Sequence, residues 1–282
     1  MKRISFRRQL LFFLVLDLLF VLAAGAAILV ISRIFKTGTP DVAELSLVDR
    51  EAGEKVDVVL LEVSRQYEWV TLNKIGTLWL GEDSSSPEKT LWPCDNDKVA
   101  AFIAEVSKTL QASKKADGVS SWRNLGLEER ECFKVKVRQE GGQPVTWRFS
   151  ADTAAQADRL VIFRTPRGQT VWEAKSSIGG FLTCTADFWA DPYAAPAFAS
   201  GGGGGERGEL FCLLPASHLK PVAVHEVSFG DVEACFTVYK KEDGYVVRPS
   251  FTCQNTPELS LINYGYLLDE AALSRLLEEI AR

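Results

Sequence analysis

A continuous apolar segment near the N-terminus constrains this chain most strongly. Residues 10–31 form a run of 22 residues in which Asp17 is the only charged side chain. A helix of that length measures roughly 33 Å at 1.5 Å per residue, which is enough to cross the ~30 Å hydrocarbon core of a bilayer. The sequence therefore predicts a transmembrane helix over residues 10–31, with the membrane as one partner of the chain.

The charges beside this segment predict its orientation. Four basic residues precede the run and two follow it, and the positive-inside rule keeps the more basic flank in the cytoplasm. We therefore expect a single-pass protein of the cytoplasmic (inner) membrane, with its N-terminus inside and its C-terminal domain extracytoplasmic. A cleaved signal peptide with a small-residue site at Ala24–Ala26 is the alternative.

Asp17 would lie inside that helix, near the middle of the bilayer. An isolated carboxylate at such a depth is costly, and it usually faces a partner helix or takes up a proton. Asp17 is therefore a candidate contact to another membrane-protein subunit. The alternative is a protonated, tolerated acid in a single anchor.

The charge balance limits the partners of the rest of the chain. The sequence has 32 Lys and Arg against 37 Asp and Glu, a net charge of −5. Residues 1–38 hold six of the basic and one of the acidic side chains, so the remainder carries a net charge of −10. Because such a domain is repelled by phosphate backbones, we expect no nucleic-acid partner.

Two similar stretches follow the apolar segment. Each begins with alternating apolar residues, turns at a glycine, Gly76 or Gly244, and continues as another apolar strand, which predicts hairpins. Each stretch closes with a helix, over residues 99–106 or 273–280, whose apolar positions recur at i, i+3, i+4 and i+7.

Aspartates at the expected N-caps support both helices. Asp95 and Asp269 stand four residues before the first apolar position of each helix, where a carboxylate can accept the free amide protons of the first turn. We therefore predict an α+β fold, in which one transmembrane helix precedes two related strand–hairpin–helix modules that flank a β-rich middle segment. The predicted divisions are a cytoplasmic basic tail (1–9), the transmembrane helix (10–31), a juxtamembrane linker (32–54), the first module (55–114), the middle segment (115–190), an Ala/Pro/Gly linker (191–208) and the second module (209–282).

The cysteines are the next candidates for chemistry. All six follow the apolar segment, and an even number in an oxidising compartment suggests up to three disulfides. Cys235 and Cys253 flank a predicted hairpin and form the best single candidate pair. Buried, reduced thiols that pack as small apolar residues are the alternative.

The chain carries no recognisable catalytic, cofactor or metal motif. His218 and His225 lie between Cys212 and Cys235, but their spacings are wider than those of zinc ligands. We therefore predict that the protein is not an enzyme and binds no cofactor, no metal and no identifiable small molecule. Of seven tryptophans, Trp92 precedes the first predicted helix in a loop and is a candidate stacking platform for a sugar or peptide ligand.

The order of these features resembles a bacterial family. A membrane span, a hairpin that ends at Trp79, a helix capped by Asp95, a Leu125–Leu127 segment and a β-rich run over residues 164–172 resemble the proteins grouped as domain of unknown function 4340. The resemblance covers roughly residues 50–282. Family members often carry an aromatic residue where this chain has Leu125.

The resemblance implies a role as well as a fold. Members of that family are often encoded beside gliding-type ABC transporter subunits, which implies a membrane-anchored, non-catalytic accessory protein of a transport or export complex, with other membrane subunits as partners. An envelope glycan- or peptide-binding module is the alternative function. The family supplies no catalytic residues to carry over.

Overall fold

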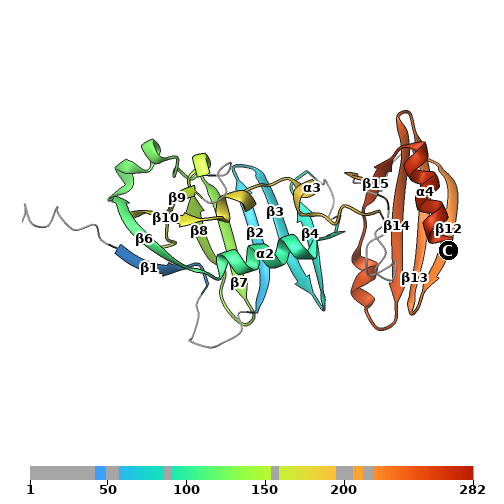
Figure 1. The fold of residues 1–282 in the computed structure, drawn as a ribbon, viewed down its shortest axis with the longest axis horizontal. Coiled ribbons are helices and arrows are strands. Elements are labelled where there is room, and N and C mark those ends of the chain that lie inside the picture. The colour runs from blue at the N-terminus through green and yellow to red at the C-terminus, as the bar shows by residue number, and fades with distance from the viewer. Residues whose placement is uncertain are drawn as a thin grey trace, which may run out of the picture. The chain divides into compact units, whose positions relative to one another are not determined.

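The computed structural model describes residues 42–48, 57–85, 90–153, 159–194, 206, 208–211 and 219–281. They belong to one compact unit that begins at Val42. This unit is mostly β-structure and contains a ten-stranded and a five-stranded sheet (Figure 1).

The large sheet has the strand order β1-β6-β10-β9-β8-β7-β2-β3-β4-β5, and its neighbouring strands are antiparallel. Alternation along a strand separates its two faces: Phe133, Val135 and Val137 of β7 are buried, whereas the residues between them are partly exposed. Its strands are β1 (Val42–Ser46), β2 (Val58–Arg65), β3 (Glu68–Ile75), β4 (Leu78–Asp83), β5 (Trp92–Pro93), β6 (Thr109–Ala116), β7 (Phe133–Gln139), β8 (Val145–Phe149), β9 (Arg159–Arg164) and β10 (Val171–Ser176).

Helix α2 (Asn96–Val106) lies across one face of the large sheet (Figure 1). It begins where the Asp95 carboxylate accepts hydrogen bonds from the backbone N–H groups of Asp97 and Lys98, so the predicted N-cap is confirmed. Its buried apolar residues Val99, Phe102 and Val106 join the main hydrophobic core. The short helix α3 (Ala186–Trp189) adds the fully buried Trp189 beside the Phe102 ring, at a centroid distance of 5.2 Å.

The small sheet has the order β11-β15-β14-β13-β12 and is also antiparallel. Its strands are β11 (Glu209–Phe211), β12 (Pro221–Phe229), β13 (Val232–Lys241), β14 (Gly244–Cys253) and β15 (Gly265–Leu268). Helix α4 (Glu270–Ile280) packs against this sheet, and its N-cap is the predicted Asp269, which accepts from the backbone N–H of Ala272. Short 3₁₀ helices are η1 (Val119–Ser121), η2 (Arg123–Leu125), η3 (Ala151–Thr153), η4 (Ile178–Phe181) and η5 (Pro257–Leu261).

The predicted fold class is wrong, although its hairpins and capped helices are present. The hairpins β2–β3–β4 and β12–β13–β14 form as expected. However, β2 also pairs along its other side with β7 of the predicted middle segment, so the first hairpin is an inner part of the large sheet. The described part of the chain is therefore mostly β-structure and has no separate strand–hairpin–helix modules.

The membrane predictions are corrected as well. No helix in the described part of the chain is long and apolar enough to span a bilayer; the two longest have 11 residues each. The predicted transmembrane helix (10–31), with Asp17 and the basic tail, lies outside the described residues. The predicted juxtamembrane linker (32–54) contains β1, a strand of the large sheet. We therefore do not carry the inner-membrane localisation forward.

A cluster of salt bridges holds the loop between β6 and β7 against the large sheet. The Glu129 carboxylate lies 2.9 Å from Lys134 Nζ and 2.6 Å from nitrogens of both Arg148 and Arg164. The Arg164 guanidinium in turn stacks over the Trp122 ring at 3.8 Å from its centroid. Burial raises the pKa of Glu129, but hydrogen bonds from Lys134 and Arg148 outweigh it and lower the pKa to about 2.

This cluster predicts a loss of stability in acid. Because the folded-state pKa of Glu129 is depressed, its contribution is present above the ordinary value of 4.5 and is lost as the pH falls towards 2. Glu129 is 51% exposed and screened by water, so we expect Glu129→Gln to cost only about 1 kcal/mol at neutral pH and clearly less near pH 2, where part of the carboxyl is protonated. Urea unfolding measured between pH 7 and pH 2, with Glu131→Gln on the same loop as the control, tests this. A constant difference between wild type and Glu129→Gln across that range would contradict the assignment.

Candidate functional site

Trp92, the predicted ligand platform, lies inside the protein. Its side chain is fully buried, and its indole Nε1 donates a hydrogen bond to the Asp83 carboxylate at 3.3 Å. The ring fills the space above Gly81, where a β-carbon would lie 2.0 Å from a ring atom. The prediction of an exposed stacking surface at Trp92 is therefore wrong.

The predicted disulfide between Cys235 and Cys253 is also absent, and both residues are free thiols. In the β13–β14 register Cys235 pairs with Ser250, whereas Cys253 pairs with Val232. Three register positions separate the two cysteines, an odd number, so their side chains point to opposite faces of the sheet. Two such side chains cannot meet without breaking the register.

The histidines do not form a metal site with the cysteines in the described part of the chain. His225 lies on β12, while His218 and Cys212 lie outside the described residues. Among the described residues, no three His, Cys, Asp or Glu side chains are close enough to hold a metal ion.

One small hollow does collect carboxyl groups. Asp187, Asp191 and Glu209 line a cavity of about 160 Å³ together with Tyr266, and burial raises the pKa of Asp187 and of Asp191. Pockets that bind small molecules usually measure roughly 300–1,000 Å³. A cavity of this size does not admit a sugar ring or a peptide residue between the carboxyls, so we assign it no catalytic role.

Strand β12 is the described surface best suited to bind another molecule. The two sheets end in four edge strands, and β1, β5 and β11 have only 5, 2 and 3 residues. Strand β12 has 9 residues, with a register shift between Pro221 and Ala223, and within the described part of the chain it pairs on one side only, with β13. Native proteins usually shorten, charge or cover such an edge, because its free N–H and C=O groups can pair with another strand.

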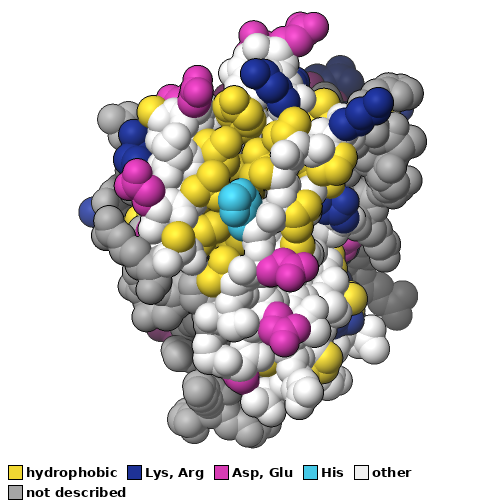
Figure 2. Space-filling model, turned by 90° about the vertical axis from the view of Figure 1, so that its right-hand side faces the viewer, with side chains coloured by type: hydrophobic (Ala, Val, Ile, Leu, Met, Phe, Trp, Pro, Cys, Tyr) yellow, Lys and Arg dark blue, Asp and Glu magenta, His cyan; other side chains and the backbone are white. Residues whose placement is uncertain are grey.

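The side chains of β12 give this edge an exposed apolar surface. Val222 and Val224 point to the outer face of the sheet and are 56% and 55% exposed. Between Val222 and Phe229 the strand has one charged residue, Glu226, and no lysine. Figure 2 shows the side of the molecule that carries β12, where hydrophobic side chains gather around the described histidine.

His225 adds an unsatisfied polar group at the middle of this strand. The residue is half-buried, and its Nε2 atom is buried without a hydrogen-bond partner among the described residues. Buried nitrogens are rarely left unpaired in folded proteins. His225 lies opposite the buried Phe236 in the β12–β13 register, on the inner face of the sheet, so this nitrogen does not face the valine surface.

The sequence reasoning predicted the strand but not its importance. It predicted a hairpin that turns at Gly244 and considered His225 only as a possible metal ligand. The sequence did contain one signal. Val222 and Val224 lie on the face opposite Ala223 and Val227, and a strand with apolar residues on both faces is usually covered by another element on each face.

The comparisons with known proteins add no relative. No protein-family model, curated protein or solved structure matches the chain. The resemblance to domain of unknown function 4340 therefore stays a prediction.

Proposed function

We propose that this protein is a non-catalytic accessory protein that binds an extended segment of a partner protein along strand β12. The observation that carries the proposal is a nine-residue edge strand with exposed valines and no blocking lysine. An added strand would pair its backbone with the free edge, which is a recurring mode of peptide recognition.

The charges near the edge define the partner segment. Glu226 lies on the outer face of β12, and Glu233 of the neighbouring strand lies on the same face beside a hollow of about 340 Å³. Residues directly opposite each other in an antiparallel pair prefer unlike charges, and apolar residues prefer apolar neighbours. The segment we propose therefore places apolar residues opposite Val222 and Val224 and a lysine or arginine opposite Glu226, at every second position along one face of the added strand.

The alternative function, an envelope glycan- or peptide-binding module, loses Trp92 as its candidate surface because that ring is buried. The partner that the family resemblance implies, a subunit of an ABC-type transport complex, is compatible with strand addition. We propose such a subunit as the first natural partner to test.

A positive charge at the centre of the edge should weaken binding. We expect Val224→Lys to weaken binding of a labelled eight-residue peptide, with lysine at position 3, valine at positions 5 and 7 and threonine elsewhere, at least tenfold in 0.15 M salt. The new charge repels the peptide lysine and removes part of the valine surface that the peptide covers. Fluorescence anisotropy measures the affinity. The matched control is Leu160→Lys, since Leu160 is 58% exposed but lies on the inner strand β9.

Two further outcomes would overturn the proposal. A peptide N-methylated at alternate residues cannot pair its backbone, so equal binding of that peptide would show plain charge attraction. If light scattering instead shows a wild-type dimer that Val224→Lys converts to monomers, a second copy of the chain occupies the edge and no separate partner is needed.

A further inference from the structure

The large sheet contains an internal gap between β8 and β9. Strand β8 pairs with β7 at five positions, from Val145 to Phe149. On its other side it pairs with β9 at only two, through Arg148 and Phe149. The first part of β8, Val145–Trp147, therefore presents an unpaired side in the middle of a ten-stranded sheet.

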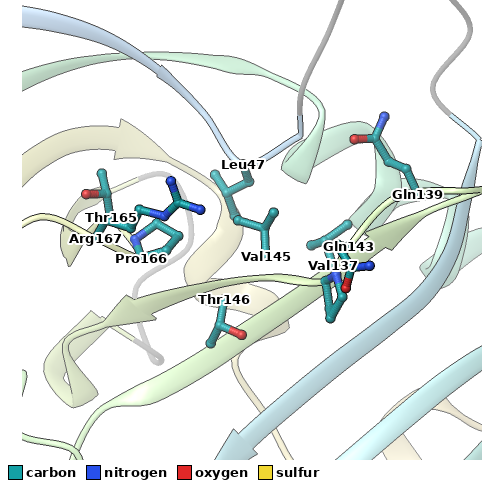
Figure 3. Close-up of a pocket in the computed structure, with 11 residues that line it drawn as sticks. Leu47, Val137, Gln139, Gln143, Val145, Thr146, Thr165, Pro166 and Arg167 are labelled. Atoms are coloured by element: carbon teal, nitrogen blue, oxygen red, sulfur yellow. The ribbon is translucent and has the colours of Figure 1, made fainter.

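A pocket of about 580 Å³ opens at this gap. Leu47, Val137 and Val145 give it an apolar floor, and the chain that follows β9 supplies the opposite wall (Figure 3). This volume lies within the range of roughly 300–1,000 Å³ that is usual for ligand sites. Unlike the small acidic hollow, it could accept a whole amino-acid residue.

The polar groups around the pocket define the charge of its ligand. Among the described residues that line it, Arg167 is the single charged one, and none of them carries a carboxylate. In Figure 3 the Arg167 side chain reaches towards Leu47, and the amide of Gln143 lies on the opposite side. The structure records neither an ion pair nor a hydrogen bond for the Arg167 guanidinium among the described residues, although the chain as a whole is acidic.

We propose that this pocket binds the C-terminal end of an extended peptide whose last residue is apolar. The terminal carboxylate would pair with Arg167, whose forked guanidinium suits a carboxylate. The last side chain would cover Leu47, Val137 and Val145, and the peptide backbone would add to the unpaired side of β8. The site is separate from the β12 edge and does not depend on the function proposed for that edge.

A labelled hexapeptide that ends in valine tests the carboxylate requirement. We expect the full chain to bind the peptide acid at least tenfold more tightly than the same peptide with a C-terminal amide, as measured by fluorescence anisotropy. Arg167→Gln should remove this difference, because a glutamine carries no charge to pair with the carboxylate. The matched control, Arg130→Gln, replaces an exposed arginine on the loop before β7 and should preserve the difference.

Further probes distinguish a peptide carboxylate from a free small carboxylate, and binding at this pocket from binding at the β12 edge. N-acetylvaline carries the same carboxylate and side chain without a strand, so competition as strong as that of the peptide would assign the pocket to free small carboxylates and overturn the peptide proposal. Equal affinity for acid and amide, or no binding of either, would also overturn it. Binding that survives Val224→Lys would support it, since that substitution alters only the β12 edge.

Discussion

Gly81→Ala should destabilise the fold by about 3 kcal/mol or more, a large effect for the addition of one methyl group. A β-carbon at Gly81 would lie 2.0 Å from the Trp92 ring, within a core where overpacking typically costs about 1–3 kcal/mol. Three ring atoms lie within 2.5 Å of that position, and Trp92 is fully buried, so the ring has no free space into which to turn. Urea unfolding monitored by circular dichroism measures the loss.

Two comparisons make this prediction specific to the contact. Gly142→Ala is the matched control, because a β-carbon there meets its nearest neighbour at an ordinary 3.5 Å. A double-mutant cycle with Trp92→Leu should recover part of the loss, since the smaller side chain vacates the space above residue 81. Strictly additive effects of the two substitutions would contradict direct packing of Trp92 on Gly81.

The contact between Trp92 and Gly81 shows why the sequence alone did not reveal that Trp92, the predicted ligand platform, is buried. Local patterns place Trp92 just before a capped helix, and that position suggests a surface loop. Its burial depends instead on β5 pairing with β4, where Trp92 lies opposite a residue without a side chain. Such a fit between two strands is a tertiary property that periodicity does not encode.

The elements that were predicted correctly are those that depend on neighbours in the chain. The caps at Asp95 and Asp269 and the hairpins with turns near Gly76 and Gly244 require only a few adjacent residues. The similarity of the two stretches was misleading, because capped helices and glycine hairpins recur in unrelated sheets. The two stretches differ in the second neighbour of their first strand: β2 also pairs with β7, 70 or more residues away, whereas β12 has no second neighbour among the described strands.

The disulfide error could have been avoided with the sequence alone. Once a two-residue turn is placed at Glu242 and Asp243, the pairing of Lys241 with Gly244 determines every later partner in the hairpin. Cys235 then falls opposite Ser250, and Cys253 falls on the other face. Counting residue pairs outward from the turn would have shown that the two cysteines do not face each other.

Glu105→Ala should lower the free energy of unfolding by about 3 kcal/mol, the second large effect that we expect. The substitution removes the hydrogen-bond acceptor that joins α2 to the end of β10. The Glu105 carboxylate is 5% exposed and accepts hydrogen bonds from Ser176 Oγ at 2.7 Å and from the Ser177 backbone N–H at 2.8 Å. Lys108 pairs with its other oxygen. Truncation would leave the Ser176 hydroxyl without this acceptor, and unsatisfied buried groups cost about 1–3 kcal/mol each.

The pH dependence of this loss separates charge from hydrogen bonding. Burial raises the pKa of Glu105, but the hydrogen bonds from Lys108, Ser176 and Ser177 outweigh it, so the pKa lies below its ordinary value of 4.5. The stabilisation that comes from the charge is therefore complete above pH 4.5 and disappears as the pH falls through the folded-state pKa.

Glu105→Gln keeps an acceptor oxygen for Ser176 and Ser177 but loses the charge, so its deficit in unfolding free energy relative to wild type should shrink in acid. Urea unfolding at pH 7 and at successive pH values below 4.5 measures that deficit. If it does not change with pH, the carboxylate acts only as a hydrogen-bond acceptor, and the ion pair with Lys108 contributes nothing to stability.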